Sequence, residues 1–136
     1  TISIFASKHA KEVIGVELNK QAIKDAKINQ KINKINNINF IADDATNFMT
    51  HMAKERFEVD VVIMDPPREG STKQFINAIG HLNPKKVVYI SCDPKTLKRD
   101  LYDFGEIDYY VDKIEGFDNF SKTQHLECAC VKKKKN

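Results

Sequence analysis

The apolar positions of the chain alternate between short continuous runs, which are typical of buried strands, and longer segments with apolar residues three or four positions apart, which are typical of helices. This alternation predicts an α/β protein with a parallel, doubly wound sheet and helices on both of its faces. The pattern places strands at 13–17, 38–42, 59–64, 86–91, 109–115 and 126–132, and helices at 20–33, 45–52, 72–79 and 94–105.

Local signals define several of these boundaries. Asn19 is a typical N-cap, Pro94 stands where the first turn of a helix accepts proline, and Gly80 is expected to end the helix before it. No long helix separates the last two strands, so this pair is able to form an antiparallel ladder. Residues 1–5 resemble the middle of an element and include no initiator methionine, so we expect the chain to be a fragment of a longer protein.

The composition agrees with one packed domain over residues 1–136, since 41% of the residues are hydrophobic and 30% are charged. No apolar run approaches the roughly 20 residues of a membrane helix, and no targeting segment is apparent, so we expect no membrane partner. The net charge of +3 is compatible with nucleic acid but does not require it. The lysines at 132–135 are more typical of a solvated tail than of a binding site.

The cysteines disfavour a disulfide framework because their number, three, is odd. Cys128 and Cys130 are separated by one residue, whereas zinc and redox motifs separate their cysteines by two. We therefore predict no metal site and a reducing, cytoplasmic location.

Acidic residues follow the first two predicted strands, at Glu17 and at Asp43 and Asp44. In open α/β sheets, ligands bind outside the carboxyl ends of the strands. A carboxylate at Glu17 suits the hydroxyls of a ribose, and one at Asp43 or Asp44 suits the amino group of an adenine. Each acid is also explained as a cap of the following helix, where the dipole favours negative charge. The residues alone leave both interpretations open.

The run Asp65-Pro66-Pro67-Arg68-Glu69-Gly70 is the sharpest local signal. Two prolines stiffen the chain where it leaves a buried strand, which suits a wall that holds a carboxylate against a flat ring. The run is similar to the Asn/Asp-Pro-Pro-Tyr motif of methyltransferases that act on base nitrogens. Arg68 replaces the aromatic residue of that motif, which argues against methylation of an amino group.

Two further residues are candidates for covalent chemistry. Cys92 stands at the start of a predicted helix, where the dipole favours a thiolate, although an isolated cysteine at a strand end is more often structural. Glu127 lies in an apolar strand, so it is either a general base or a residue on the outward face. His125 alternates onto the same face and is more typical of an orienting or structural histidine than of a metal ligand. Each of four polar residues follows the carboxyl end of a predicted strand, so we expect them to meet at one edge of the sheet: Glu17, Asp44, Asp65 and Cys92.

Four runs together make the chain resemble the RNA 5-methyluridine methyltransferases, the uracil-C5 family that acts on 23S ribosomal RNA and on tRNA. They are VIGVE at 13–17, DPPREG at 65–70, YISCDPKTLKRD at 89–100 and DNFSKTQHLE at 118–127. Asp93 stands where asparagine is frequent in the family and Ser121 where proline is frequent, and neither departure removes a catalytic group.

The resemblance implies S-adenosylmethionine as the cofactor and RNA as the partner, with 23S ribosomal RNA favoured over tRNA and a monomeric intact enzyme. It implies that Cys92 adds to uracil C6 and that Glu127 removes the C5 proton. It assigns Glu17, Asp44 and Asp65 to the cofactor, and Asp65, Pro66 and Arg68 to the base and its surroundings. Arg68 and Arg99 are able to contact phosphates, although solvation of both is equally plausible.

Two features of the family are missing from the sequence. The glycine-rich loop that holds the methionine end of the cofactor is expected just before Thr1, and an iron–sulfur cluster is expected only in an N-terminal part outside this chain. The strand before that loop is normally central, so the strands at 13–17 and 59–64 are expected to lack their shared neighbour. We expect the isolated chain to be marginally stable and impaired in cofactor binding.

Three alternatives remain at this point. The first is a tRNA 5-methyluridine methyltransferase. The second is a fragment of this fold that binds RNA without catalysis, which the joint presence of Cys92 and Glu127 disfavours for the parent protein. The third is a nicotinamide-dependent oxidoreductase on a similar sheet, which the Asp-Pro-Pro and Ser-Cys-Asp-Pro runs do not support.

Overall fold

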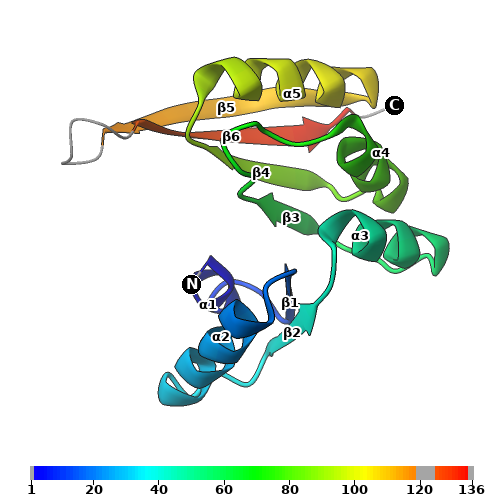
Figure 1. The fold of residues 1–136 in the computed structure, drawn as a ribbon. Helices are drawn as coiled ribbons and strands as arrows, with labels where there is room; N and C mark the ends of the chain where they lie inside the picture. Colours follow the sequence, from blue (N-terminus) through cyan, green and yellow to red (C-terminus); the bar gives the residue numbers. More distant parts are fainter. Residues whose placement is uncertain (1, 119–124, 135–136) are drawn as a thin grey trace. The chain divides into compact units, whose positions relative to one another are not determined.

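A computed structural model describes residues 2–118 and 125–134 and divides the chain into two compact units, residues 1–48 and 49–136 (Figure 1). Strands and helices alternate as the sequence predicts, which confirms the α/β class. The elements are α1 (Ile2–Ser7), β1 (Val13–Glu17), α2 (Lys20–Ile32), β2 (Ile38–Ala42), α3 (Ala45–Lys54), β3 (Val61–Met64), α4 (Lys73–Leu82), β4 (Lys86–Ser91), α5 (Pro94–Glu106), β5 (Tyr109–Asp118) and β6 (His125–Lys133).

The first unit is built on a parallel pair of strands, β1 and β2, in which Val13 lies opposite Ile38. The predicted N-cap of α2 is confirmed, since the Asn19 Oδ1 atom accepts hydrogen bonds from the backbone N–H groups of Gln21 and Ala22. Among the described residues of this unit, burial is limited to Ile23, Ile38 and Ser7. The unit therefore has a small core.

The second unit contains a mixed sheet with the strand order β3-β4-β6-β5. β3 and β4 are parallel, whereas β6 runs antiparallel to both β4 and β5. The predicted antiparallel pairing of the last two strands is confirmed. The sequence did not indicate the place of β6 in the sheet, which lies between β5 and β4 and is antiparallel to both.

Helices α4 and α5 cover one face of the mixed sheet. The buried core is shared by the inward residues of the strands and by apolar residues of the two helices: Val62, Met64, Val87, Tyr89, Ala129, Val131, Tyr109, Ile76, Ile79, Leu82, Leu97 and Phe104. On β3, Val61 and Ile63 alternate to the opposite face and are exposed. The alternation of burial along β3 and β4 is what orients this sheet beneath α4 and α5.

The sequence did not predict α1, and the boundaries of the other helices agree with the predicted ones to within two residues except at the end of α4. Gly80 lies inside that helix, which continues to Leu82 and ends at Asn83, a residue in the left-handed conformation with φ 61°. The N–H of Asn83 donates to the carbonyl of Ile79 and closes the last turn. An asparagine cap replaces the predicted glycine because asparagine tolerates this conformation better than most residues.

Two features concern the edges of the sheets. β1 and β3 belong to different sheets in the described part of the chain, as expected for strands without a shared neighbour. At the other edge of the mixed sheet, the pairing of β5 with β6 shifts register between Val111 and Lys113, which places a bulge at Asp112.

No helix within the described ranges combines the length and the apolar character needed to cross a bilayer.

Candidate active site

The carboxyl ends of β1 and β2 bring Glu17 close to Asp43 in the first unit. Glu17 lies opposite Ala42, and the N–H of Asp43 donates to the carbonyl of Glu17 at 3.1 Å. Asp44 follows directly. These acids therefore share the edge at which a ligand of an open α/β sheet would bind, as the sequence predicts for this pair of strands.

The side chains of these acids also cap the backbone. The Glu17 Oε1 atom accepts from the N–H of Asn19 at 3.0 Å, and the Asp44 Oδ1 atom accepts from the N–H of Asn47 at 2.9 Å in the first turn of α3. Both residues are exposed, so each carboxylate keeps acceptor capacity toward solvent. Two exposed carboxylates at one sheet edge fit the hydroxyl and amino donors of a nucleoside.

In the second unit, Asp65 and Cys92 lie just beyond the carboxyl ends of the neighbouring parallel strands β3 and β4. Both residues are exposed. The surrounding chain nevertheless desolvates the Asp65 carboxyl in part and raises its pKa above the ordinary value. The parallel pairing thus brings these two predicted site residues to the same end of one sheet.

The turn that carries Cys92 is fixed by its neighbours on either side. The Ser91 hydroxyl accepts from the N–H of Asp93 at 3.1 Å and donates to the Asp93 carbonyl at 2.9 Å. Asp93 is the N-cap of α5, where its Oδ1 atom accepts from the N–H of Lys95 at 2.9 Å, and Pro94 begins the helix as predicted. Cys92 is therefore an exposed thiol at the N-terminus of a capped helix.

Glu127 reaches the same end of the sheet from the antiparallel strand β6. It lies opposite Ser91, the residue before Cys92, and it is half-buried. The strand order β3-β4-β6 therefore sets Asp65, Cys92 and Glu127 on adjacent strands. Residues 119–124 of the run DNFSKTQHLE, Ser121 among them, lie outside the described residues, and so does the side chain of His125.

The structure separates the predicted site residues into two groups. Glu17 and Asp44 belong to the first unit, whereas Asp65, Pro66, Arg68, Cys92 and Glu127 belong to the second. A single edge shared by all of them stays a prediction. Within the second unit, Pro66 is half-buried and Arg68 is exposed. The described residues contain no cluster of histidine, cysteine or acidic side chains that could hold a metal ion.

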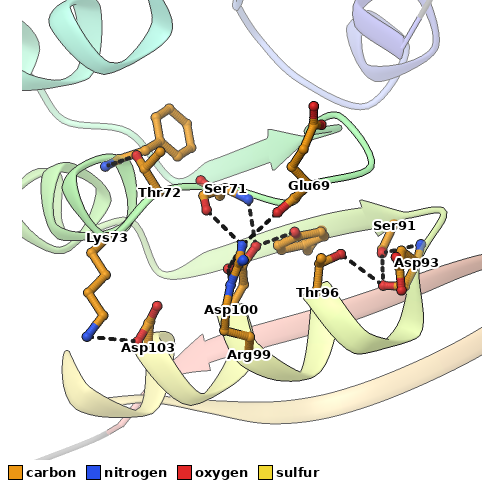
Figure 2. A network of polar contacts seen from close by, with 12 residues as sticks. Glu69, Ser71, Thr72, Lys73, Ser91, Asp93, Thr96, Arg99, Asp100 and Asp103 are labelled. Atoms are coloured by element: carbon orange, nitrogen blue, oxygen red, sulfur yellow. Dashed lines mark hydrogen bonds and ion pairs between the residues drawn. The ribbon is translucent and has the colours of Figure 1, made fainter.

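A buried acid that the sequence did not single out lies beside the loop that follows β3. Asp100 is 0% exposed, and its Oδ2 atom accepts from the Tyr89 hydroxyl at 2.5 Å and from the N–H of Ser71 at 2.7 Å (Figure 2). Burial and the Asp100 carboxylate both raise the pKa of Tyr89. The signal in the sequence was the spacing of Leu97, Asp100 and Phe104, which puts a carboxylate on the apolar face of α5.

Comparisons with known proteins identify a family and several related RNA methyltransferases. The family described as tRNA (Uracil-5-)-methyltransferase matches residues 1–135. An uncharacterized RNA methyltransferase of Lactobacillus johnsonii is 44% identical over 131 residues, 96% of this chain and 29% of the relative, and one of Clostridium tetani is 41% identical over 127 residues, 93% of this chain and 28% of the relative. The chain thus spans less than a third of the length of these relatives.

A solved structure is similar in both sequence and fold. It is the tRNA (uracil-54, C5)-methyltransferase of Pyrococcus abyssi in complex with S-adenosyl-L-homocysteine, which matches with a TM-score of 0.75 and 28% identity. The match covers 94% of this chain and 30% of the Pyrococcus chain.

Proposed function

This chain belongs to the tRNA (Uracil-5-)-methyltransferase family, and from that premise we propose that it carries the catalytic groups for methylation of uracil C5 in RNA. The observation that carries the proposal is the convergence of Asp65, Cys92 and Glu127 at one end of the mixed sheet. The proposal concerns the intact protein of which this chain supplies these groups.

Cys92 is proposed as the nucleophile. Uracil C5 alone is a weak nucleophile, so the ring needs activation before it accepts a methyl group. The Cys92 thiolate forms a bond to C6, and the electron pair of the C5–C6 double bond moves onto the ring as an enolate with carbanion character at C5. Exposure of Cys92 supports this role, whereas Cys128 is half-buried and burial raises the pKa of its thiol.

Glu127 is proposed as the base that completes the reaction. Once C5 carries the new methyl group, the carboxylate takes the C5 proton, the electrons of that C–H bond restore the C5–C6 double bond, and the bond between C6 and the Cys92 sulfur breaks. The thiolate is thereby regenerated. The position of Glu127 opposite Ser91, one residue from the nucleophile, supports this assignment.

Asp65 is proposed to select uracil. A carboxylate can accept the N3 proton of uracil, and cytosine has no proton at that position. Pro66 and Arg68 follow Asp65 in the loop after β3, and they are proposed to contact the base and the neighbouring RNA. Because the base must reach Asp65 and Cys92 outside a helix, we expect a flipped or single-stranded uridine.

S-adenosylmethionine is the proposed cofactor, and when bound it supplies the methyl group. Glu17 and Asp44 would hold its ribose and adenine, in keeping with their exposed carboxylates at the end of β1 and β2. The backbone bonds that these carboxylates already make fix their direction.

Two kinds of RNA are candidates for the substrate. The resemblance of the sequence favours 23S ribosomal RNA, and the Pyrococcus structure favours tRNA as the alternative, since that protein is named for position 54 of tRNA. Both candidates share the cytoplasmic location and the chemistry proposed above. Mass mapping of ribosomal RNA and tRNA from a strain that lacks the gene distinguishes them, because only the true substrate loses a methyl group.

Substitution of the two catalytic groups in the intact enzyme tests the mechanism. We expect Cys92→Ala to abolish both methylation and the covalent RNA adduct, and we expect Glu127→Gln to accumulate the adduct, since its formation precedes proton removal. Adducts are measured as a slower band on a denaturing gel, and methylation is measured by transfer of a labelled methyl group to RNA.

Cys130→Ala is the matched control, because Cys130 is a half-buried cysteine of β6 that has no part in the proposed chemistry. We expect this variant to methylate RNA at the normal rate. An active Cys92→Ala enzyme would rule out the nucleophile and with it the proposed function of this site.

A further inference from the structure

Helix α5 contacts the loop that joins β3 to α4 through Thr96, Arg99 and Asp100. This loop, residues 65–72, is called the Asp65 loop below. The Thr96 Oγ1 atom donates to the carbonyl of Arg68 at 3.1 Å. The Arg99 Nη2 atom donates to the carbonyls of Glu69 at 2.8 Å and Ser71 at 3.0 Å (Figure 2). Three backbone carbonyls of the loop are therefore tied to side chains of one helix.

Asp100 anchors these contacts from below the surface. Its Oδ1 atom accepts from the Nε and Nη2 atoms of Arg99 at 3.1 and 3.0 Å, while its Oδ2 atom holds the N–H of Ser71 and the Tyr89 hydroxyl. A fully buried carboxylate is stable only when its oxygens are satisfied in this way. The carboxylate therefore orients the Arg99 guanidinium toward the loop, although 53% of the Arg99 side chain remains exposed.

The loop itself is shaped to fit this contact. Gly70 has φ +82°, and a Cβ atom there would lie 2.6 Å from Arg99 Nη2 and 2.7 Å from Asp100 Oδ2. Only a residue without a side chain permits both the backbone conformation and the close approach to α5. The glycine of the DPPREG run is thus explained by its contact with the helix.

The same helix also begins at the nucleophile. α5 starts at Pro94, directly after Cys92 and its N-cap Asp93. A helix of 13 residues moves as one body, so a loop bonded to Thr96, Arg99 and Asp100 keeps a fixed position relative to the turn that carries Cys92. The contacts join the two parts of the candidate site that lie on different strands.

We propose that Arg99 and Asp100 are positioning residues that hold the Asp65 loop in register with Cys92, so that a base bound by Asp65 presents its C6 atom to the thiolate. This inference rests on the proposed function, because it assigns Asp65 to the base and Cys92 to the attack. It adds the reason why the two groups stay aligned: the loop that carries Asp65 is hydrogen-bonded to α5, and the turn that carries Cys92 leads directly into the same helix.

Arg99→Lys in the intact enzyme separates positioning from binding of RNA phosphates. The lysine keeps the positive charge, but its single ammonium cannot replace the guanidinium fork that bonds Glu69, Ser71 and Asp100 together. We expect kcat for methylation to fall about 10- to 100-fold, since misplacement by about 1 Å is enough for such a loss, while KM for RNA stays within about twofold.

Thr96→Val is the second variant, and it keeps the charge and nearly the volume of the side chain. It removes the hydrogen bond to the loop at Arg68 and also the bond that the same hydroxyl makes to the Asp93 carbonyl at 3.2 Å. We expect a smaller fall in kcat, about three- to tenfold, again with KM unchanged. Lys98→Ala is the control, because it removes an exposed positive charge from the same helix and Lys98 makes none of the contacts to the loop. We expect its kcat to equal that of the wild type.

The melting temperature of each variant is measured alongside, together with the rate at which iodoacetamide alkylates Cys92. Positioning predicts a normal alkylation rate in Arg99→Lys, whereas general loosening of the fold would change it. Thr96→Val is compared by kcat and KM alone, because its hydroxyl also bonds Asp93 next to Cys92. Wild-type kcat in both variants, or a loss that falls entirely on KM, overturns the positioning role. If Cys92→Ala is inactive in the same assay, that result leaves the proposed function intact; if Cys92→Ala is active, the proposed function itself fails.

Discussion

At the scale of single residues, Tyr109 illustrates how one buried hydroxyl supports the second unit. It is 1% exposed, and its hydroxyl donates to the carbonyl of Pro84 at 2.5 Å. We expect Tyr109→Phe to lower the free energy of unfolding by about 1–3 kcal/mol, because the substitution leaves a buried carbonyl without its donor. Urea unfolding monitored by circular dichroism measures the difference.

The same residue predicts a dependence on pH. Burial raises the pKa of Tyr109 to about 12 in the folded chain. A group whose pKa is raised on folding makes its full contribution to the free energy of unfolding below its unfolded pKa, which is about 10 for tyrosine. That contribution is lost as the pH rises toward the pKa of the folded state. The stability advantage of the wild type over Tyr109→Phe should therefore shrink between pH 10 and pH 12. An advantage that stayed constant over this range would contradict the burial of the hydroxyl.

The residue scale also shows what a sequence does and does not reveal about the site. Asp65 and Cys92 were identifiable because each directly follows an apolar run, and chain order alone places it at a strand end. Asp100 was missed because it follows Lys98 and Arg99, and a run of charges in a helix is usually a solvated face. Its burial depends on Tyr89 and Ser71, which meet α5 only in the folded chain.

At the scale of elements, the end of α4 depends on a residue with positive φ. Asn83 has φ 61° and ψ 47°, a conformation that costs most residues about 1–2 kcal/mol. We expect Asn83→Ala to lower the free energy of unfolding by about 1 kcal/mol, whereas Asn83→Gly should change it by only a few tenths. Thermal unfolding of the two variants makes the comparison, and equal losses would show that the side chain of Asn83 matters more than its backbone conformation.

Most elements were predictable because their signals are local. The N-cap at Asn19 and the proline at Pro94 fix the starts of α2 and α5, and β4 matches its predicted bounds at Lys86 and Ser91. The end of α4 was not predictable in this way. Gly80 is an ordinary stop signal, but here it packs near Ile107 inside the helix.

The order of the strands was beyond the reach of local signals. Alternation of strands and helices predicts parallel neighbours in chain order, and β3 with β4 follows that rule. β6 instead enters between β4 and β5, and this pairing joins residues such as Val88 and Cys130 that are far apart in the sequence. Such pairing is decided by the complementary apolar faces of whole strands, so it requires the folded structure.

At the scale of the molecule, the two units have unequal cores. Ile23 and Ile38 are the buried apolar residues among the described part of residues 1–48, whereas the core of the second unit includes Ile76, Val87 and Val131, all 0% exposed. We expect backbone amides of β1 and β2 to exchange with deuterium sooner than those of β4 and β6, because opening the smaller core exposes less apolar surface. Hydrogen exchange followed by mass spectrometry measures both sets.

Matched core variants check this expectation. Ile76→Ala removes a buried side chain from the larger core and should lower the stability of the second unit by about 2–5 kcal/mol, which speeds exchange in β4 and β6. Ile38→Ala should speed exchange in β1 and β2. Equal protection of β1 and β4 in the unsubstituted chain would contradict the inequality of the cores.

The bulge at Asp112 has a consequence for crowded solutions. β5 is the outer strand of the mixed sheet, and a long straight outer strand offers its free N–H and C=O groups to another copy of the protein. The shift between Val111 and Lys113 breaks that row of groups, and the ion pair of Lys113 with Glu115 sets charge beside it. A second chain that approached this edge could form only a few backbone hydrogen bonds with β5 before the bulge interrupted them. The bulge therefore disfavours aggregation through this strand.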